Sequence, residues 1–252
     1  MSKEKKFNNK QIKILQMRDT SDKAVIKKNI IFDVPLRLGI VGNSGSGKTN
    51  FLGSIILDPL NQFYKDVWLP ENIYVFSGSL KTDNKIQGII KALDIPNSNT
   101  FDEYNDDIVN LLYEQIEDMV AKTTEKKGKQ EHSLFIFDDL SYSNSIRNKR
   151  NNALGRLFLN GRKNQISTIF VAQRYNQILP SVRVNLTGLV MFNMPTSELE
   201  MVERDHNFKP NRKSFYQMVR NNLKERHDFL IINYSNKYLE MYLDKNFKSI
   251  VD

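Results

Sequence analysis

A glycine-rich loop between an apolar segment and a helical segment is the feature that most constrains the fold of this chain. The loop reads Gly42-Asn43-Ser44-Gly45-Ser46-Gly47-Lys48-Thr49 and fits the pattern G-x-x-x-x-G-K-[ST]. Residues 36–41 before it are mostly apolar and strand-like, and residues 50–57 after it carry apolar side chains at helical spacing. This order predicts a loop that wraps phosphate groups, because glycines let successive backbone N–H groups point at anionic oxygens.

The residue types at the end of the loop predict a nucleoside triphosphate as its ligand. The positive end of the following helix attracts phosphate. We expect Lys48 to reach the β- and γ-phosphates and the Thr49 hydroxyl to hold Mg²⁺. Residues 42–50, ending at Asn50, are therefore predicted to bind ATP together with Mg²⁺.

Composition excludes several other classes of protein. The chain has 252 residues, 40% of them hydrophobic, which suits one α/β domain with additions or a domain with a small appendage. No apolar run has the length of a membrane span, and residues 1–10 lack the apolar segment of a secretory signal, so we expect neither. The absence of cysteine excludes thiol catalysis and zinc–thiolate sites. His132, His206 and His227 are scattered and lack the spacing of metal ligands.

The net charge of +8 is concentrated in one stretch of sequence. Between Asp139 and Glu198 there is no acidic residue. The basic residues of that stretch are Arg147, Lys149, Arg150, Arg156, Arg162, Lys163, Arg174 and Arg183. Such a block suits a polyanionic partner, either the triphosphate of a neighbouring subunit or a nucleic-acid backbone. The alternative is a solvated basic face.

Alternating apolar strands and amphipathic helices predict an α/β fold. We expect strands at 35–41, 72–77, 133–137, 166–172 and 187–194, and a hairpin of 229–233 with 238–243 across Ser235 and Asn236. We expect helices at 50–57, 86–93, 106–120, 145–161, 197–205 and 211–223, and an exposed loop at 122–132. The apolar stripe of the helix at 106–120 comprises Ile108, Leu111, Leu112, Ile116 and Met119.

This order of elements predicts a P-loop NTPase of the ASCE type. Its mainly parallel central sheet is expected to be covered by helices. We divide the chain into a basic N-terminal arm at 1–30, a P-loop ATPase core at 31–200, and a C-terminal extension at 201–252. The extension is expected to consist of helices and the β-hairpin and to pack on the core.

Two strands of the predicted sheet end in polar residues that suit catalysis. Residues 134–137 are apolar and lead into Asp138 and Asp139. We expect Asp138 to organise hydrated Mg²⁺ and Asp139 to act as general base on the attacking water. The next strand ends at Gln173. We expect Gln173 to contact the γ-phosphate or the attacking water and to transmit the change on hydrolysis to the rest of the subunit. The alternative for Gln173 is a backbone hydrogen bond at the start of a loop.

The order of these motifs resembles a known family. Leu157-Phe-Leu-Asn-Gly161-Arg162-Lys-Asn follows the two aspartates, and Pro180-Ser-Val-Arg183-Val-Asn185 follows Gln173. Together with the phosphate loop, these pieces resemble the genome-packaging ATPases of nucleocytoplasmic large DNA viruses and their virophages, within the FtsK–HerA superfamily. The resemblance covers roughly residues 30–200. Many superfamily members carry Glu where this chain has Asp139, so the general-base position departs from that pattern.

The resemblance implies a function, an assembly and partners. It implies an ATP-driven homo-oligomeric ring, a pentamer or a hexamer, that translocates double-stranded DNA into a preformed capsid. Capsid or portal-vertex proteins would be its partners, and the host cytoplasm or the virion its location, with no membrane involved. In such rings a neighbour's arginine completes the active site.

We identify two candidates for that arginine. Arg162 is the first choice, because Gly161 can release it from the preceding helix toward a neighbouring subunit. Arg183 is the second, because Pro180 and Asn185 frame it in a turn. The alternatives are an arginine at a helix C-terminus for Arg162 and a buried ion pair for Arg183.

DNA contacts are predicted from two basic clusters. Arg147, Lys149 and Arg150 follow the strand that ends in Asp138. Lys209, Arg212, Lys213 and Arg220 form the second cluster, and the first three of them are the predicted contacts. A translocase grips phosphates and needs no base-reading motif. The nearby aromatic residues Phe208, Phe215 and Tyr216 are expected in the core.

Two other functions share these motifs. One is an FtsK- or HerA-like translocase for plasmid transfer or segregation, and the other is a P-loop nucleoside or small-molecule kinase. The paired aspartates and the strand ending in Gln173 favour hydrolysis over transfer to an acceptor. The sequence lacks the Asn-Lys-x-Asp motif of GTPases and the Ser-Gly-Gly signature of transporter ATPases.

Overall fold

The fold is built around one eight-stranded sheet. The computed structural model describes residues 25–26, 28, 31–58, 62–126, 128–140 and 153–250. The strands are β1 (Arg37–Val41), β2 (Trp68–Ser77), β3 (Thr100–Phe101), β4 (His132–Asp138), β5 (Ile166–Ala172), β6 (Gly188–Phe192), β7 (Phe229–Asn233) and β8 (Tyr242–Leu243). Their order across the sheet is β3-β2-β4-β5-β1-β6-β7-β8. Strands β1 to β6 are parallel and the last two antiparallel, so the prediction of a mainly parallel sheet is confirmed.

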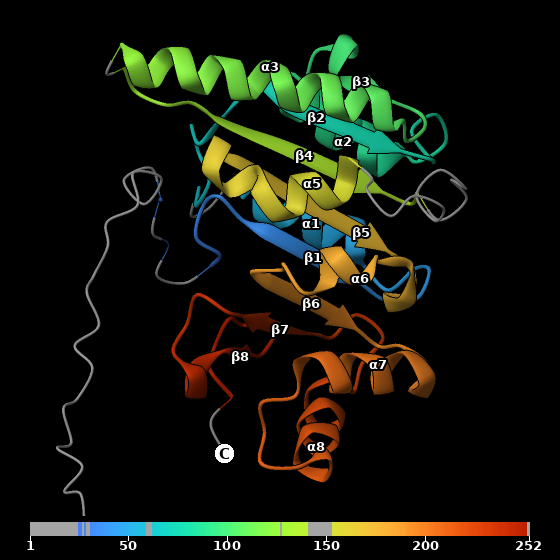
Figure 1. The fold of residues 1–252 in the computed structure, drawn as a ribbon. Coiled ribbons are helices and arrows are strands. Elements are labelled where there is room, and N and C mark those ends of the chain that lie inside the picture. Colours follow the sequence, from blue (N-terminus) through green and yellow to red (C-terminus); the bar gives the residue numbers. More distant parts are fainter. Residues whose placement is uncertain are drawn as a thin grey trace, which may run out of the picture.

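The central strands are apolar because both of their faces are covered. Every residue of β4, β5 and β6 is buried, as expected for parallel strands between two layers of helices. In Figure 1 the arrowheads of β4, β5 and β6 point to the same side, whereas that of β7 points the other way. The carboxyl ends of the parallel strands therefore share one edge of the sheet, where α/β proteins place their ligands.

Helices cover the sheet on two faces (Figure 1). They are α1 (Lys48–Leu57), α2 (Asn84–Ala92), α3 (Asp106–Glu125), α5 (Ala153–Asn160), α6 (Pro180–Arg183), α7 (Thr196–His206) and α8 (Arg212–Asn222). Short 3₁₀ helices are η2 (Asn97–Asn99), η3 (Gly161–Asn164), η4 (Tyr175–Gln177) and η5 (Tyr238–Glu240). One apolar cluster joins α1 and α2 to the sheet, and a second joins α3, α5 and α8 to its other face. Alternate strand residues feed the two clusters, for example Ile136 and Phe137 of β4.

Helix α3 corrects two predictions. It continues to Glu125, so the start of the predicted exposed loop at 122–132 is helical. Its buried face also differs from the predicted stripe, because Leu111 is 55% exposed and Met119 is 40% exposed. The face turned inward carries Val109, Tyr113 and Ile116. Packing against α5 determines which face is buried, because Arg156 of α5 lies over the Tyr113 ring, with its Cζ 4.2 Å from the ring centre.

The C-terminal extension continues the same sheet. Strand β7 pairs with β6, and β8 pairs with β7 through Ile231 opposite Leu243, which confirms the hairpin. Its second strand is shorter than predicted, because residues 238–240 form η5. Phe215 is fully buried and Phe208 partly buried, which confirms their expected core positions.

Some predictions fall outside the described residues. Most of the N-terminal arm at 1–30 lies there, although Ile26 bridges Val34. The helix predicted at 145–161 is described only from Ala153, where α5 begins. The domain boundaries remain a prediction. Within the described ranges, none of the helices combines the length and apolar character that crossing a membrane requires.

Candidate active site

The phosphate loop connects β1 to α1 at the carboxyl edge of the sheet. Gly42 has a φ of 157°, and a Cβ there would lie 2.5 Å from Cβ of Phe192 on the neighbouring strand. Gly47, with a φ of 112°, is the N-cap of α1. Only glycine adopts these conformations without strain. No side chain caps α1, and its first turn holds no acidic residue. Its backbone N–H groups are thus suited to an anion.

Lys48 lies across its own loop. Its Nζ donates hydrogen bonds to the carbonyl oxygens of Gly42 at 2.8 Å and Asn43 at 3.0 Å. Burial lowers the pKa of Lys48, while Asp138 and Asp139 act in the opposite direction. A lysine held by neutral carbonyls can exchange them for charged phosphate oxygens, which form stronger hydrogen bonds.

Asp138 is the last residue of β4 and is almost completely buried. Oγ of Ser77, at the end of β2, donates a hydrogen bond to its Oδ2 at 3.2 Å. The pKa of Asp138 is raised to about 6, mainly by burial. Asp139 and Asp83 also raise it, whereas the Ser77 hydrogen bond and Lys48 lower it. A buried carboxylate of this kind favours a cation as its partner.

Asp139 and Gln173 meet at the ends of neighbouring strands. Gln173 follows β5, and its Nε2 donates to Oδ1 of Asp139 at 3.0 Å. Oε1 of Gln177 accepts from the backbone N–H of Gln173 at 3.1 Å, which holds the start of the loop. Asp139 has a φ of 47°. A Cβ at Gly78, the residue after β2, would lie 2.6 Å from the carbonyl oxygen of Asp139. The backbone at the end of β2 therefore lies very close to that of Asp139.

These groups border one cavity of about 240 Å³. Its lining includes Ser44, Gly45, Gly47, Lys48, Thr49, Asn50, Asp138, Asp139 and Gln173. The structure therefore brings together the loop, the two aspartates and the glutamine that the sequence predicted. The cavity also contains residues that sequence reasoning missed, namely Ser79, Asp83, Lys85 and His227. Nδ1 of His227 lies 3.0 Å from the carbonyl oxygen of Ser46, a contact across the whole chain that no local pattern signals.

The donor set suits Mg²⁺ brought with a nucleotide. Thr49 and Asp138 border the same cavity and supply a hydroxyl and a carboxylate, the oxygen ligands that Mg²⁺ prefers. In the described part of the chain there is no cluster of three or more metal-binding side chains. Phosphate and water oxygens would then complete the coordination, as is usual for Mg²⁺ in such sites.

The two candidate arginines lie in different settings. Arg162 is an exposed residue of η3, just before β5 begins. The phosphate loop follows the carboxyl end of β1, which is parallel to β5, so Arg162 lies at the opposite edge of the sheet. Nη1 of Arg183 is 2.9 Å from Oδ2 of Asp205, and its guanidinium lies 4.9 Å from the Tyr175 ring centre. Arg183 therefore forms an ion pair within its own chain, which was the alternative to a role in the site of a neighbouring subunit.

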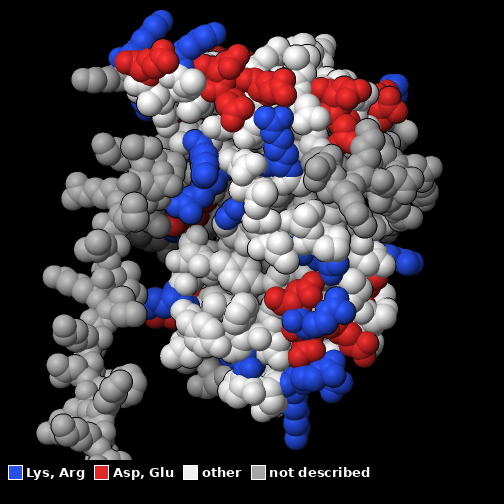
Figure 2. Space-filling view, viewed as in Figure 1, with Lys and Arg blue, Asp and Glu red and all other residues white. Residues whose placement is uncertain are grey.

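Two of the predicted DNA-contacting residues have partners within the chain. Nε of Arg212 is 2.9 Å from Oε2 of Glu203, and Nζ of Lys209 lies 5.4 Å from the Tyr242 ring centre. Lys213 is exposed. Figure 2 shows charges of both signs intermixed at the lower right, over α7 and α8, and acidic side chains along the top, over α3. Arg147, Lys149 and Arg150 lie outside the described residues.

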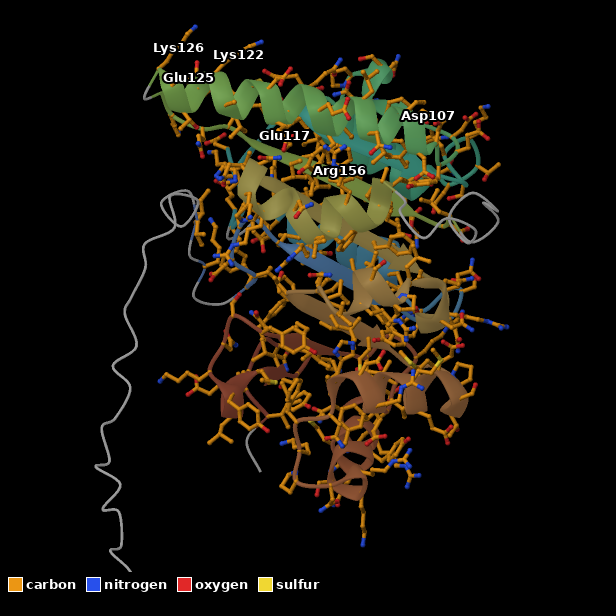
Figure 3. All side chains as sticks on the ribbon, viewed as in Figure 1. Asp107, Glu117, Lys122, Glu125, Lys126 and Arg156 are labelled. Atoms are coloured by element: carbon orange, nitrogen blue, oxygen red, sulfur yellow. The ribbon has the colours of Figure 1, made fainter. Side chains whose placement is uncertain are left out.

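Another residue of the basic block is paired with α3. Arg156 of α5 points toward Glu117 in Figure 3, and its Nη2 is 3.5 Å from Oε2 of that residue. Its Nη1 lies 3.2 Å from Oε1 of Glu114. The stretch without acidic residues is therefore partly neutralised by segments before and after it.

Comparison with solved structures supports the fold. The chain is similar to the genome packaging NTPase B204 of Sulfolobus turreted icosahedral virus 2, solved in complex with AMP. The TM-score is 0.53 at 17% identity, over 80% of this chain and 94% of B204. EssC of Geobacillus thermodenitrificans, in its ATPases 2 and 3, gives a TM-score of 0.56 at 15% identity, over 84% of this chain and 39% of EssC.

Comparison with known sequences gives the family. The chain is 29% identical over 201 residues to the DNA packaging protein OPG160 of variola virus, which covers 79% of this chain and 67% of the relative. OPG160 of monkeypox virus matches over the same length, 61% of that protein. The sequence model of the family described as Poxvirus A32 protein matches residues 23–245, and this chain therefore belongs to that family.

Proposed function

We propose that this chain is an ATP-hydrolysing motor that translocates double-stranded DNA into a preformed viral capsid. The observation that carries the proposal is the hydrogen bond between Gln173 and Asp139, beside Lys48 in one cavity. That arrangement provides a phosphate-binding loop and a positioned general base, the two parts that hydrolysis requires. The relatives named DNA packaging proteins support the proposal that the energy of ATP hydrolysis is used to package DNA.

The phosphate loop, Lys48, Asp139 and Gln173 have separate roles in the proposed hydrolysis. The N–H groups of the loop and of the first turn of α1 bind the phosphates, and Lys48 moves from Gly42 and Asn43 to the β- and γ-phosphates. Asp139 orients the attacking water and accepts its proton. Gln173 holds the Asp139 carboxylate in position and responds when the γ-phosphate leaves.

The proposed Mg²⁺ site consists of Thr49 and Asp138. Bound there, the ion would neutralise charge on the β- and γ-phosphate oxygens. Asp138 must lose its proton to take part, and Lys48 and Ser77 favour its ionised form. Ser77 also fixes one carboxylate oxygen through its hydrogen bond, which leaves the other for coordination.

The motor is proposed to act as a homo-oligomeric ring. Arg162 cannot serve its own phosphate loop from the opposite edge of the sheet, which favours a role in the site of a neighbour. Capsid or portal-vertex proteins are the proposed docking partners, in the host cytoplasm or the virion. Arg147, Lys149, Arg150, Lys209, Arg212 and Lys213 are proposed to grip DNA phosphates, which requires some intramolecular ion pairs to exchange.

The proposal is tested by steady-state ATP hydrolysis with and without long double-stranded DNA, at low and moderate salt. The Lys48→Ala variant serves as the blank. We expect DNA to stimulate turnover and the stimulation to fade as salt rises, because phosphate contacts release counterions. Turnover that DNA does not change would favour a kinase or a protein-directed ATPase, and phosphoryl acceptors would then be screened.

A translocase for plasmid transfer or segregation uses the same site. It is distinguished by its substrate, since such a motor moves DNA without a capsid. Packaging of DNA into purified empty capsids, measured as nuclease-protected DNA, separates the two. The relatives' names favour the packaging outcome.

A further inference from the structure

The turn before β7 lies beside the phosphate loop because β7 is antiparallel to β6. Phe229, the first residue of β7, pairs with Phe192, the last residue of β6. Strand β6 is parallel to β1, whose carboxyl end leads into the phosphate loop. The start of β7 therefore lies at the same edge of the sheet as that loop (Figure 1). The segment between α8 and β7, residues 223–228, is thus placed at the phosphate-binding edge.

Asp228 holds this turn in one conformation. Its Oδ2 accepts hydrogen bonds from the backbone N–H groups of Lys224 at 3.1 Å and of Glu225 at 2.8 Å. Its Oδ1 lies 2.6 Å from Nζ of Lys245. Asp228 is itself buried. Because hydrogen bonds to an ionised carboxylate are strong, these contacts fix the backbone of residues 224–228.

Two residues of the turn lie against the phosphate loop. Nδ1 of His227 is 3.0 Å from the carbonyl oxygen of Ser46. Nη2 of Arg226 is 3.1 Å from the point that a Cβ on Gly45 would occupy. Gly45 borders the phosphate cavity. The guanidinium of Arg226 is therefore held beside the part of the loop that is expected to bind phosphate.

The phosphate cavity has room in its charge balance for another cation. Its lining contains two lysines, Lys48 and Lys85, and three aspartates, Asp83, Asp138 and Asp139. A nucleoside triphosphate stays anionic when Mg²⁺ is bound to it. The lysines of the lining are already opposed by the aspartates, so a cation from outside the lining would add to the attraction for phosphate.

Arg226 has the chemistry for this task. Its side chain is exposed, and among the described residues it has no carboxylate partner. A guanidinium is always charged and presents several N–H donors in a planar fork that matches two phosphate oxygens. Arg226 can therefore bind phosphate without first breaking an ion pair.

We propose that Arg226 binds the phosphate chain of the nucleotide held by the phosphate loop of its own subunit. The inference rests on the proposed function, because it requires the loop to hold a triphosphate. The C-terminal extension then contributes directly to the nucleotide site, and its contribution is independent of the nucleoside. This role in cis is separate from the role in trans proposed for Arg162.

The test measures the binding of ATP and of inorganic tripolyphosphate, which has no nucleoside, by isothermal titration in the presence of Mg²⁺. We expect Arg226→Ala to weaken the binding of both probes about tenfold, because each loses a hydrogen bond to a charged group. Wild-type affinity of Arg226→Ala for both probes would overturn the proposal. A loss for ATP alone would place Arg226 at the nucleoside and would also contradict it.

Lys224→Ala is the matched control. Lys224 is an exposed cation of the same turn, and its side chain is more than 4 Å from the Cβ point of Gly45. This variant should bind both probes as the wild type does. Losses of equal size in Arg226→Ala and Lys224→Ala would assign the effect to overall positive charge and would rule out a specific phosphate contact.

A second variant and a folding measurement guard against a misfolded Arg226→Ala protein. Chemical denaturation without nucleotide should give the wild-type midpoint, because Arg226 is exposed. Arg226→Gln removes the charge, keeps a polar side chain and should show the same losses; wild-type binding in this variant would also refute the contact. If the wild type binds neither probe, the proposed function itself fails, and this outcome is distinct from the loss of one phosphate contact.

Discussion

Gln173 donates a hydrogen bond from Nε2 to Oδ1 of Asp139 over 3.0 Å, joining the ends of β5 and β4. These strands are neighbours in the sheet, with Asp138 opposite Val171, so their carboxyl ends lie side by side. An amide donor on one carboxylate oxygen restricts its rotation and leaves the second oxygen for a water molecule. The pair therefore behaves as one unit in which Gln173 positions the base.

Replacing the base is expected to separate binding from hydrolysis. Asp139→Asn keeps the shape and the contact with Gln173 but cannot accept a proton. We expect ATP affinity to change little and turnover to fall by about 10²–10⁴-fold. Titration and single-turnover hydrolysis measure the two effects, with the exposed Asp107→Asn as the control. Unchanged turnover would remove Asp139 from the mechanism.

Removing the loop lysine is expected to affect both steps. Lys48→Ala deletes the only lysine whose Nζ contacts the Gly42 and Asn43 carbonyls in the described part of the chain. We expect ATP affinity to fall by about 2–3 kcal/mol, the size of hydrogen bonds to charged groups, and hydrolysis to be lost. Lys91→Ala, an exposed change on α2 outside the cavity, should behave as wild type. Retained hydrolysis in Lys48→Ala would refute the assigned role.

Arg162 is expected to act on a neighbouring subunit. Arg162→Ala should fold and bind ATP, and its turnover in assemblies should fall by about 10³–10⁵-fold. Mixed with wild type, it should reduce activity by more than its share, because each variant subunit leaves a neighbour's site incomplete. Lys163→Ala, the next exposed residue of η3, is the matched control. A linear fall of activity with the variant fraction would argue against action in trans.

Arg183 is expected to act on stability. Its side chain is 10% exposed, paired with Asp205 and placed over Tyr175. Arg183→Met should lower the free energy of unfolding by about 1–3 kcal/mol, because it removes the more buried of the two arginines that pair with Asp205. Arg204→Ala removes a second contact to Asp205 from a mostly exposed side chain and should cost less than about 1 kcal/mol. Wild-type stability with poisoning of mixed rings would instead assign Arg183 a role in trans.

His206 is expected to make stability depend on pH. Burial lowers its pKa to about 4, against the effect of Asp205 and together with that of Arg183. Its Nε2 lies 2.6 Å from the Tyr175 hydroxyl, and its Nδ1 contacts the Tyr234 hydroxyl. The unfolded chain binds a proton near pH 6.5, so the stability contributed by neutral His206 is present above that pH. It falls as the pH drops toward 4, by up to about 3 kcal/mol.

Chemical denaturation between pH 4 and 7.5 measures this dependence. His206→Gln should lose less stability than the wild type over the same interval, because it has no titrating group. The pKa of His132 is also lowered by burial, so His132 contributes equally to the pH dependence of stability in both proteins. Identical pH profiles for the two proteins would exclude His206 as the source.

Much of the catalytic core could be predicted from the sequence, because its signals are local. The phosphate loop, the apolar run into Asp138 and the strand ending at Gln173 each depend on consecutive residues. Helix α3 shows the limit of this reasoning. Its apolar residues permit two faces, and the contact of Tyr113 with Arg156 and Asn164 selects the one that is buried. Periodicity cannot supply that choice, because it contains no information about the neighbouring element.

By itself, the sequence determined the P-loop architecture, the alternating strands and helices, and the residues at the carboxyl ends of β4 and β5. Only the tertiary structure decided which distant groups meet. It brought His227 to Ser46, paired Arg183 with Asp205, and placed Arg226 beside Gly45. These contacts depend on strand order and on the path of the C-terminal extension, and both follow from the packing of the whole chain. The sequence pattern records local backbone preference, whereas strand order is selected by the burial of apolar surface on both faces of the sheet.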